Sequence, residues 1–141
     1  ERWDGQKPDG SFQNTDMNSF NHYAYGAIGD WMYRVVAGID NVAPGYKELL
    51  IQPHPDSRLE YVNASFDSSY GIVESSWKMD STSVLITVQI PPNTSSKVVL
   101  PNAVDKMVLM NGKALTIHSE KSGANLVLKL GSGKYEFKVE R

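Results

Sequence analysis

The fold is decided by the stretch Val84-Leu85-Ile86-Thr87-Val88-Gln89-Ile90. Its apolar residues fall at every second position, and the period of two predicts a strand with one face buried and one face toward water. The segment 133–139 repeats the pattern, with Tyr135, Phe137 and Val139 alternating against charged neighbours. Because each strand has only one strongly apolar face, we expect the strands to form sheets that pack against each other.

Runs of similar character recur from residue 46 to the end of the chain, separated by turn-forming residues. We expect strands at 46–53, 59–66, 71–79, 83–90, 96–100, 106–109, 114–118, 125–130 and 133–139. Asn111-Gly112 predicts a tight hairpin turn, since this pair favours positive backbone φ angles. Short strands at regular spacing are typical of an antiparallel β-sandwich, Greek-key or jelly-roll-like. We predict such a domain over residues 44–141.

A different pattern precedes the strands. Residues 1–16 are polar and rich in turn formers, which indicates a loop. We expect a helix of about five turns from near Asn18, capped by Asp16, Asn18 or Ser19, with a left-handed residue at Gly38. Its only charges are Asp30 and Arg34, so nearly every side requires burial. We expect residues 1–40 to end a helical domain whose other helices lie upstream of residue 1.

Composition excludes several functional classes. The chain has 141 residues, a net charge of -2 and no cysteine. We therefore expect no disulfide framework, thiolate metal site or cysteine nucleophile. No basic field favours nucleic acid or anionic lipid, and no apolar run approaches the ~20 residues of a membrane span. The three histidines are dispersed, so we predict no metal site and no cofactor, and the compartment stays open between cytoplasmic and periplasmic or secreted.

One constellation has the chemistry of a sugar site. Glu1-Arg2-Trp3-Asp4-Gly5 is followed by Asn21-His22-Tyr23. An aromatic face such as Trp3 packs on the apolar side of a pyranose, and carboxylates bind hydroxyls or act as general acid or base. On the residues alone, a structural Trp-Asp-Gly turn and a helix-capping His22 explain the same pattern.

The motifs together resemble a known family. Glu1-Arg2-Trp3-Asp4-Gly5, the stretch Asn21-His22-Tyr23-Ala24-Tyr25-Gly26, and Ile51-Gln52-Pro53-His54-Pro55 are similar to the bacterial α-L-rhamnosidases of glycoside hydrolase family 78. The resemblance implies an (α/α)6 catalytic barrel ending in this helix, an inverting mechanism, Glu1 as general base, and His22 and Trp3 as contacts to rhamnose. It also implies that the general acid lies upstream, so this chain alone is expected to be inactive.

The role of the sandwich is left open by the sequence. It either braces the barrel as a structural domain, which we favour, or binds carbohydrate itself. A binding module requires a row of exposed aromatic residues, for which Tyr61, Phe66, Tyr70 and Trp77 are the candidates. We expect Trp31 and Trp77 in the core. The expected partners are a rhamnosyl glycoside and the upstream barrel, and the apolar helix predicts self-association of the isolated chain.

Overall fold

The computed structural model describes residues 5–16 and 24–141. The chain forms two compact units, Glu1–Asp30 and Trp31–Arg141, which are taken one at a time below. Among the described residues, no helix has the length and apolar character needed to cross a membrane. The predicted capping residues Asn18 and Ser19 lie outside the described ranges.

The first unit contains the predicted loop. Gln6 and Phe12 form an isolated antiparallel bridge, and the amide of Lys7 donates to the carbonyl of Ser11 at 2.8 Å. Gly10, at φ 85°, makes the turn between them. The Asp9 carboxylate accepts hydrogen bonds from the amide and hydroxyl of Ser11, and these bonds lower the pKa of Asp9. The segment after Gly5 is therefore a closed small hairpin.

The helix differs from the expected regular α-helix. Helix α1 spans Ala24–Trp31, and a π-helix, η1, continues from Met32 to Ala37. Gly38 ends it in the left-handed conformation, at φ 76° and ψ 26°, as the sequence predicts. The amide of Gly38 donates to the carbonyl of Tyr33. The wider π turn is a departure that periodicity does not encode.

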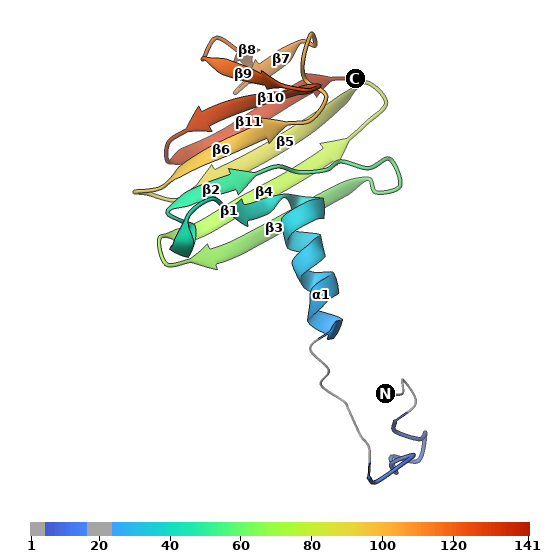
Figure 1. Ribbon diagram of the computed structural model, residues 1–141. Coiled ribbons are helices and arrows are strands. Elements are labelled where there is room, and N and C mark those ends of the chain that lie inside the picture. The colour runs from blue at the N-terminus through green and yellow to red at the C-terminus, as the bar shows by residue number, and fades with distance from the viewer. Residues whose placement is uncertain (1–4, 17–23) are drawn as a thin grey trace. The chain divides into compact units, whose positions relative to one another are not determined.

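Eleven strands form two sheets in the second unit (Figure 1). The five-stranded sheet has the order β1-β2-β6-β10-β9, and the six-stranded sheet has the order β3-β4-β5-β11-β7-β8. The bounds are β1 Ile39–Asn41, β2 Glu48–Ile51, β3 Tyr61–Ser68, β4 Gly71–Met79, β5 Ser83–Ile90, β6 Ser95–Leu100, β7 Val108–Met110, β8 Lys113–Ala114, β9 Ser119–Ser122, β10 Asn125–Leu130 and β11 Gly133–Glu140. A short 3-10 turn, η2, lies at Pro44–Tyr46.

The predicted β-sandwich preceded by a helix is confirmed, with three local differences. The pair β2–β6 is parallel, whereas the other pairs are antiparallel. The strands β1 and β9 were not expected; β1 pairs with β2, so that Ile39 lies opposite Ile51, and β9 pairs with β10. The expected strand at 114–118 is wrong, because the hairpin over Asn111 and Gly112 leaves only two residues to pair as β8.

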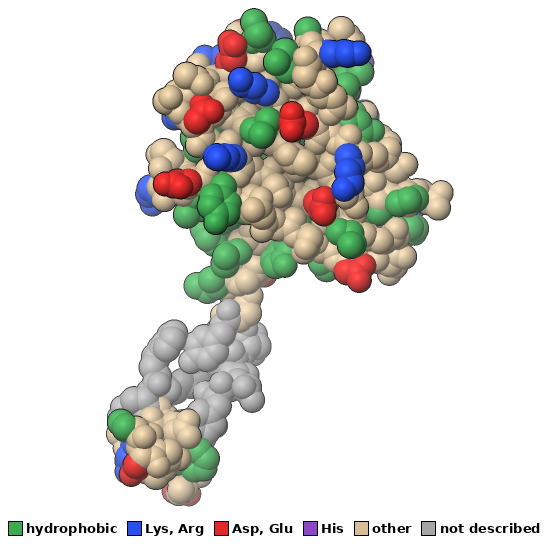
Figure 2. Space-filling model, turned by 180° about the vertical axis from the view of Figure 1, so that it is seen from behind, with side chains coloured by type: hydrophobic (Ala, Val, Ile, Leu, Met, Phe, Trp, Pro, Cys, Tyr) green, Lys and Arg blue, Asp and Glu red, His purple; other side chains and the backbone are tan. Residues whose placement is uncertain are grey.

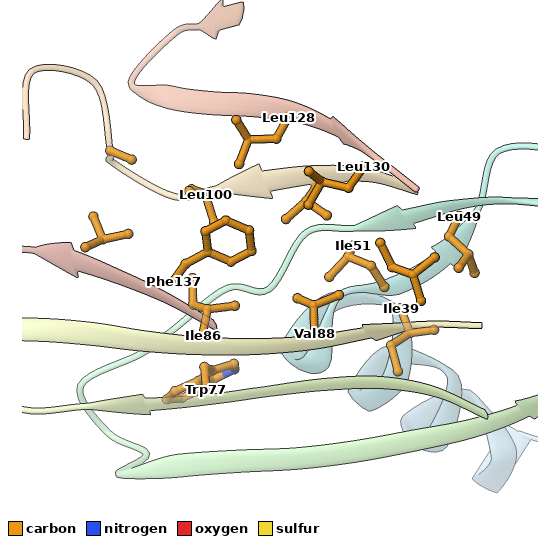
Figure 3. Packing of buried hydrophobic residues seen from close by; sticks show 14 of the residues in the cluster. Ile39, Leu49, Ile51, Trp77, Ile86, Val88, Leu100, Leu128, Leu130 and Phe137 are labelled. Atoms are coloured by element: carbon orange, nitrogen blue, oxygen red, sulfur yellow. The ribbon is translucent and has the colours of Figure 1, made fainter. Parts of the chain in front are cut away.

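The core lies between the two sheets. Figure 3 shows inward side chains from both layers meeting in one cluster, with Trp77, Ile86 and Phe137 from the six-stranded sheet and Leu49 and Leu128 from the other. Every one of these five side chains is buried. At roughly 1.5–3 kcal/mol for each large apolar side chain removed from water, this cluster dominates the stability of the unit.

The surface is mixed in charge. On the face seen in Figure 2, acidic and basic side chains alternate across the sandwich and do not gather by sign. Such a face produces no extended field of one sign.

Candidate functional site

The residues predicted to carry chemistry are not among those described. Glu1 and Trp3 fall within residues 1–4, and His22 falls within residues 17–23. Their roles as general base and sugar contacts therefore stay predictions. What the structure does describe is the segment that follows them and its attachment to the sandwich.

Three side chains of the sandwich hold the end of η1. The indole nitrogen of Trp77 donates to the carbonyl of Val36 at 2.9 Å, and the hydroxyl of Ser75 donates to the carbonyl of Ala37 at 2.6 Å. The Nδ1 atom of His54 lies 3.0 Å from the carbonyl of Val35. We call His54, Ser75 and Trp77 the helix clamp. The last carbonyls of a helix lack partners within it, and these side chains supply donors to them. The carbonyl of Val36 also accepts a longer bond, at 3.5 Å, from the amide of His54.

The backbone closes the same junction from the other side. The amide of Gln52 donates to the carbonyl of Gly38 at 2.8 Å. A Cβ atom on Gly38 would lie 2.1 Å from the carbonyl carbon of Gln52, inside any possible contact distance. Glycine is therefore required at 38 for two reasons, the positive φ angle and the close backbone approach.

The sequence builds the helix clamp from strand alternation. Val73, Ser75 and Trp77 are the inward positions of β4, and the last two are 0% and 2% exposed. A buried hydroxyl or indole N–H without a partner costs about 1–3 kcal/mol, so both donors stabilise the junction only while the helix end is in place. No buried side-chain nitrogen or oxygen in the described parts of the chain lacks a partner.

Sequence reasoning placed Trp77 correctly in the core but missed the function of its indole nitrogen. A signal was present: Ser75 occupies a core position between apolar residues, and a serine there requires an acceptor. His54 lies between Pro53 and Pro55, in the segment that follows β2. Through its contact to the carbonyl of Val35, this segment helps to hold the end of η1.

One hollow of the second unit, beside Asp56, does not have the chemistry of a hydrolase. It encloses about 580 Å³ and is lined by Asp56, Glu140 and Arg141 among others. Hydrogen bonds from Arg58 lower the pKa of Asp56 to about 2, whereas a general acid needs a raised pKa. Within residues 5–16 and 24–141, no group of three His, Cys, Asp or Glu residues is placed to hold a metal ion.

The aromatic row expected of a binding module is not formed by the four candidates. Trp77 is buried, and Phe66 packs on Tyr46 with ring centroids 4.5 Å apart. The Tyr70 ring lies under the ammonium of Lys47, at 5.1 Å. Tyr61, which is 60% exposed, is the most exposed of the four candidates, and Tyr70 is 37% exposed.

Trp31 also departs from expectation. It was predicted in the core, yet 55% of its side chain is exposed. Met32, Tyr33 and Val35 of η1, which follows Trp31 directly, are exposed as well, and we call these four apolar residues the η1 surface. The sandwich buries Val36 and Ala37 of the same helix, so it covers one side of η1.

Comparison with known proteins gives concordant matches along the chain. Residues 1–36 match the family model described as the bacterial alpha-L-rhamnosidase 6 hairpin glycosidase domain, and residues 38–114 match the bacterial alpha-L-rhamnosidase C-terminal domain. A curated α-L-rhamnosidase of Streptomyces avermitilis is 39% identical over 140 residues, which cover 99% of this chain and 13% of that protein.

Solved structures agree. An α-L-rhamnosidase from Dictyoglumus thermophilum superposes with a TM-score of 0.82 at 28% identity, over 93% of this chain and 15% of that one. The Streptomyces avermitilis α-L-rhamnosidase, crystallised in complex with L-rhamnose, gives a TM-score of 0.79 at 37% identity, over 98% of this chain and 13% of its own. The chain thus spans about one-seventh of the length of these relatives.

Proposed function

The chain belongs to the bacterial α-L-rhamnosidase family, and we propose that it works as one part of an inverting enzyme that removes terminal α-L-rhamnose from glycosides or polysaccharides. In this proposal residues 1–40 complete the active site of an (α/α)6 barrel, and residues 44–141 brace it. The relatives support the reaction, because those described above are named α-L-rhamnosidases and one of them was crystallised with L-rhamnose.

Glu1 is the general base of the proposed reaction. Its carboxylate takes a proton from a water molecule as the water oxygen attacks the anomeric carbon. The bond from that carbon to the leaving oxygen breaks, and a general acid outside this chain protonates the leaving group. Inversion requires the two carboxyl groups to stand ~6.5–9.5 Å apart, which leaves room for the water. His22 and Trp3 contact the rhamnose ring.

One observation carries the bracing role of the sandwich: the helix clamp engages three successive carbonyls at the end of η1. Two of its donors, on Ser75 and Trp77, lie in the core of the sandwich, so the helix end and the core are stable together. A displacement of about 1 Å in a catalytic group lowers turnover about a hundredfold. If the last helix of the barrel is fixed in this way, the catalytic residues next to it keep their positions.

The test is turnover of an aryl α-L-rhamnoside by the whole protein that contains this chain. Glu1→Gln is expected to lower kcat roughly 10²–10⁴-fold, because it removes the base but keeps the shape. Glu48→Gln, a change at an exposed carboxylate of β2, is the matched control and should leave kcat unchanged. NMR of the first product should show the β-anomer of L-rhamnose.

Near-normal turnover by Glu1→Gln would remove Glu1 from its role, and an α-anomeric first product would exclude inversion. The 141-residue chain by itself should show no turnover above the uncatalysed rate, since the general acid is not part of it. Measurable hydrolysis by this chain alone would contradict that placement.

A further inference from the structure

We propose that the outer face of strands β3, β4 and β5 carries an accessory binding site for a neutral sugar ring. The site is a hollow of about 280 Å³ on the solvent face of the six-stranded sheet. It is lined by Tyr61, Asn63, Ser76, Trp77, Lys78, Leu85 and Thr87. Its volume is close to the lower limit of the ~300–1,000 Å³ typical of ligand pockets, which suits a single ring.

Strand register builds the hollow. Tyr61, Lys78 and Leu85 lie opposite one another in one row across the three strands. Asn63, Ser76 and Thr87 form the next row on the same face, two residues along each strand. The second row has short side chains and the first has longer ones, so the surface is depressed beside a raised rim.

The hydrogen-bonding groups of the hollow are not engaged by the protein. Within residues 5–16 and 24–141, the side chains of Asn63, Ser76 and Thr87 have no hydrogen-bond partner, nor has the Tyr61 hydroxyl. On the inner face of β4, by contrast, Ser75 and Trp77 are both paired. The hollow therefore presents an amide and three hydroxyls that are available to a ligand.

The composition of the hollow selects the ligand class. A pyranose has hydroxyls around its edge and C–H groups on its faces, so it requires polar partners together with an apolar or aromatic surface. Tyr61 supplies the ring and Leu85 an aliphatic contact, while Asn63, Ser76 and Thr87 supply the polar groups. No described carboxylate lines the hollow, and Lys78 is the single charge at its rim. A neutral sugar fits better than a cation or a strongly acidic ligand.

The site is also preorganised. It lies on three paired strands, and directly beneath it Trp77 and Ile86 belong to the buried core. A rigid sheet loses little conformational entropy when a ligand binds, which favours even a shallow site. The flanking hollow near Ile72 and Pro91 lacks an aromatic ring, and the larger one near Asp56 is lined by several charged residues.

The experiment is a titration of the ¹⁵N-labelled 141-residue chain with L-rhamnose, followed by amide chemical shifts, with glycerol as a polyol that is not a ring. The choice of L-rhamnose rests on the proposed function, and D-glucose is titrated in parallel to test neutral sugars generally. Saturable shifts are expected in residues 61–63, 76–78 and 85–87, with a dissociation constant on the order of 1 mM.

Two variants test the contacts. Tyr61→Ala should weaken binding at least about tenfold, and Thr87→Val, which keeps the shape but removes a hydroxyl, should weaken it severalfold. Tyr70→Ala is the matched control at a second partly exposed tyrosine and should bind like the parent. Unchanged amide dispersion in each variant shows that it is folded.

Absence of saturable shifts at these residues, equal response to glycerol, or equal loss in Tyr70→Ala would overturn the site. Shifts confined to residues 1–23 would assign the sugar to the active-site segment and also overturn it. The result is separate from the proposed hydrolysis. If Glu1→Gln keeps normal turnover while rhamnose still shifts β3 and β4, the catalytic assignment fails and the accessory site stands.

Discussion

At the residue scale, Gly38 is the described glycine with the least room for a side chain. Gly38→Ala adds a Cβ atom inside contact distance of the Gln52 backbone and also places alanine at φ 76°. We expect it to lower the free energy of unfolding by about 3 kcal/mol or more, measured by urea denaturation. Gly123→Ala is the matched control, because Gly123 has a positive φ of 58° but open space around it. That change should cost about 1 kcal/mol.

Equal losses in the two glycine variants would show that backbone strain alone explains Gly38, and that the approach to Gln52 is unimportant. The sequence predicted the left-handed conformation of Gly38, since a glycine at the end of an apolar helix favours it. The close approach was not predictable, because Gln52 reaches Gly38 only through the pairing of β1 with β2.

The Asp80 carboxylate is expected to make the stability of the protein depend on pH. Its carboxylate accepts hydrogen bonds from the backbone amide and hydroxyl of Thr82 and the amide of Ser83, and these lower its pKa to about 2. A folded-state pKa below the unfolded value of about 3.9 means that the stabilisation is complete above that value and lost as pH falls toward 2. The melting temperature of Asp80→Asn should be below that of the parent at pH 7, and the gap should close between pH 4 and pH 2.

The control for this titration is Asp67→Asn, at an exposed position of β3 outside any such turn. Its melting temperature should follow the parent curve across the same range. A gap for Asp80→Asn that is constant from pH 7 to pH 2 would mean that the ionised carboxylate is not the stabilising form.

At the scale of elements, the helix clamp joins the end of η1 to the sandwich. Trp77→Phe removes the indole N–H but keeps an aromatic ring, and Ser75→Ala removes the hydroxyl. Ser75→Ala removes the hydroxyl donor to the carbonyl of Ala37, and Trp77→Phe leaves the carbonyl of Val36 with only the 3.5 Å bond from the amide of His54. Each change should lower the free energy of unfolding by about 1–3 kcal/mol. Amide hydrogen exchange should rise in residues 32–38 more than in β10. Tyr135→Phe is the control, because it removes a single peripheral hydrogen bond to the carbonyl of Gly131. It should change the free energy of unfolding and the amide exchange of η1 only slightly.

Exchange that rises equally in η1 and β10 would indicate general loosening of the core, and would count against a local role for the clamp. A double variant adds information. Because Ser75 and Trp77 hold neighbouring carbonyls of one helix end, the losses should be less than additive once the first bond is gone.

Sequence pattern predicts some of the strands and helices accurately and misses others. The strands β4, β5, β10 and β11 match their predicted ranges to within one residue. Alternation with one buried face is clear in β4 and β11, whereas β10 buries both Val127 and Leu128 and is recognised by the turn residues on either side of it. The three-residue β1 has too few positions to alternate. The carbonyls at the end of η1 accept hydrogen bonds from side chains 38 and 41 residues away in sequence, and no local period contains that information.

At the scale of the whole molecule, the candidate site divides into a part that sequence predicts and a part that only structure supplies. Glu1, Trp3 and His22 were chosen by resemblance to a family, and the matches over residues 1–36 and 38–114 confirm the family. The helix clamp and the hollow on strands β3, β4 and β5 were recognised only in the structure, because each is made by residues that are distant in sequence. The proposed domain limits, 1–40 and 44–141, stay a prediction, and the helix clamp acts across the segment between them.

The η1 surface is expected to cause self-association of the 141-residue chain. Trp31, Met32, Tyr33 and Val35 are all exposed, and an apolar patch of this kind favours association. The proposed barrel would cover this surface in the whole enzyme. The 141-residue chain on its own should therefore self-associate with rising concentration in sedimentation velocity, and the double change Met32→Lys with Val35→Lys should keep it monomeric. Met107→Lys, an equally exposed methionine outside η1, should not. If the chain is monomeric at all concentrations, or if Met107→Lys alone disperses it, the η1 surface is not the region that needs a partner, and the case for a barrel seated on it weakens.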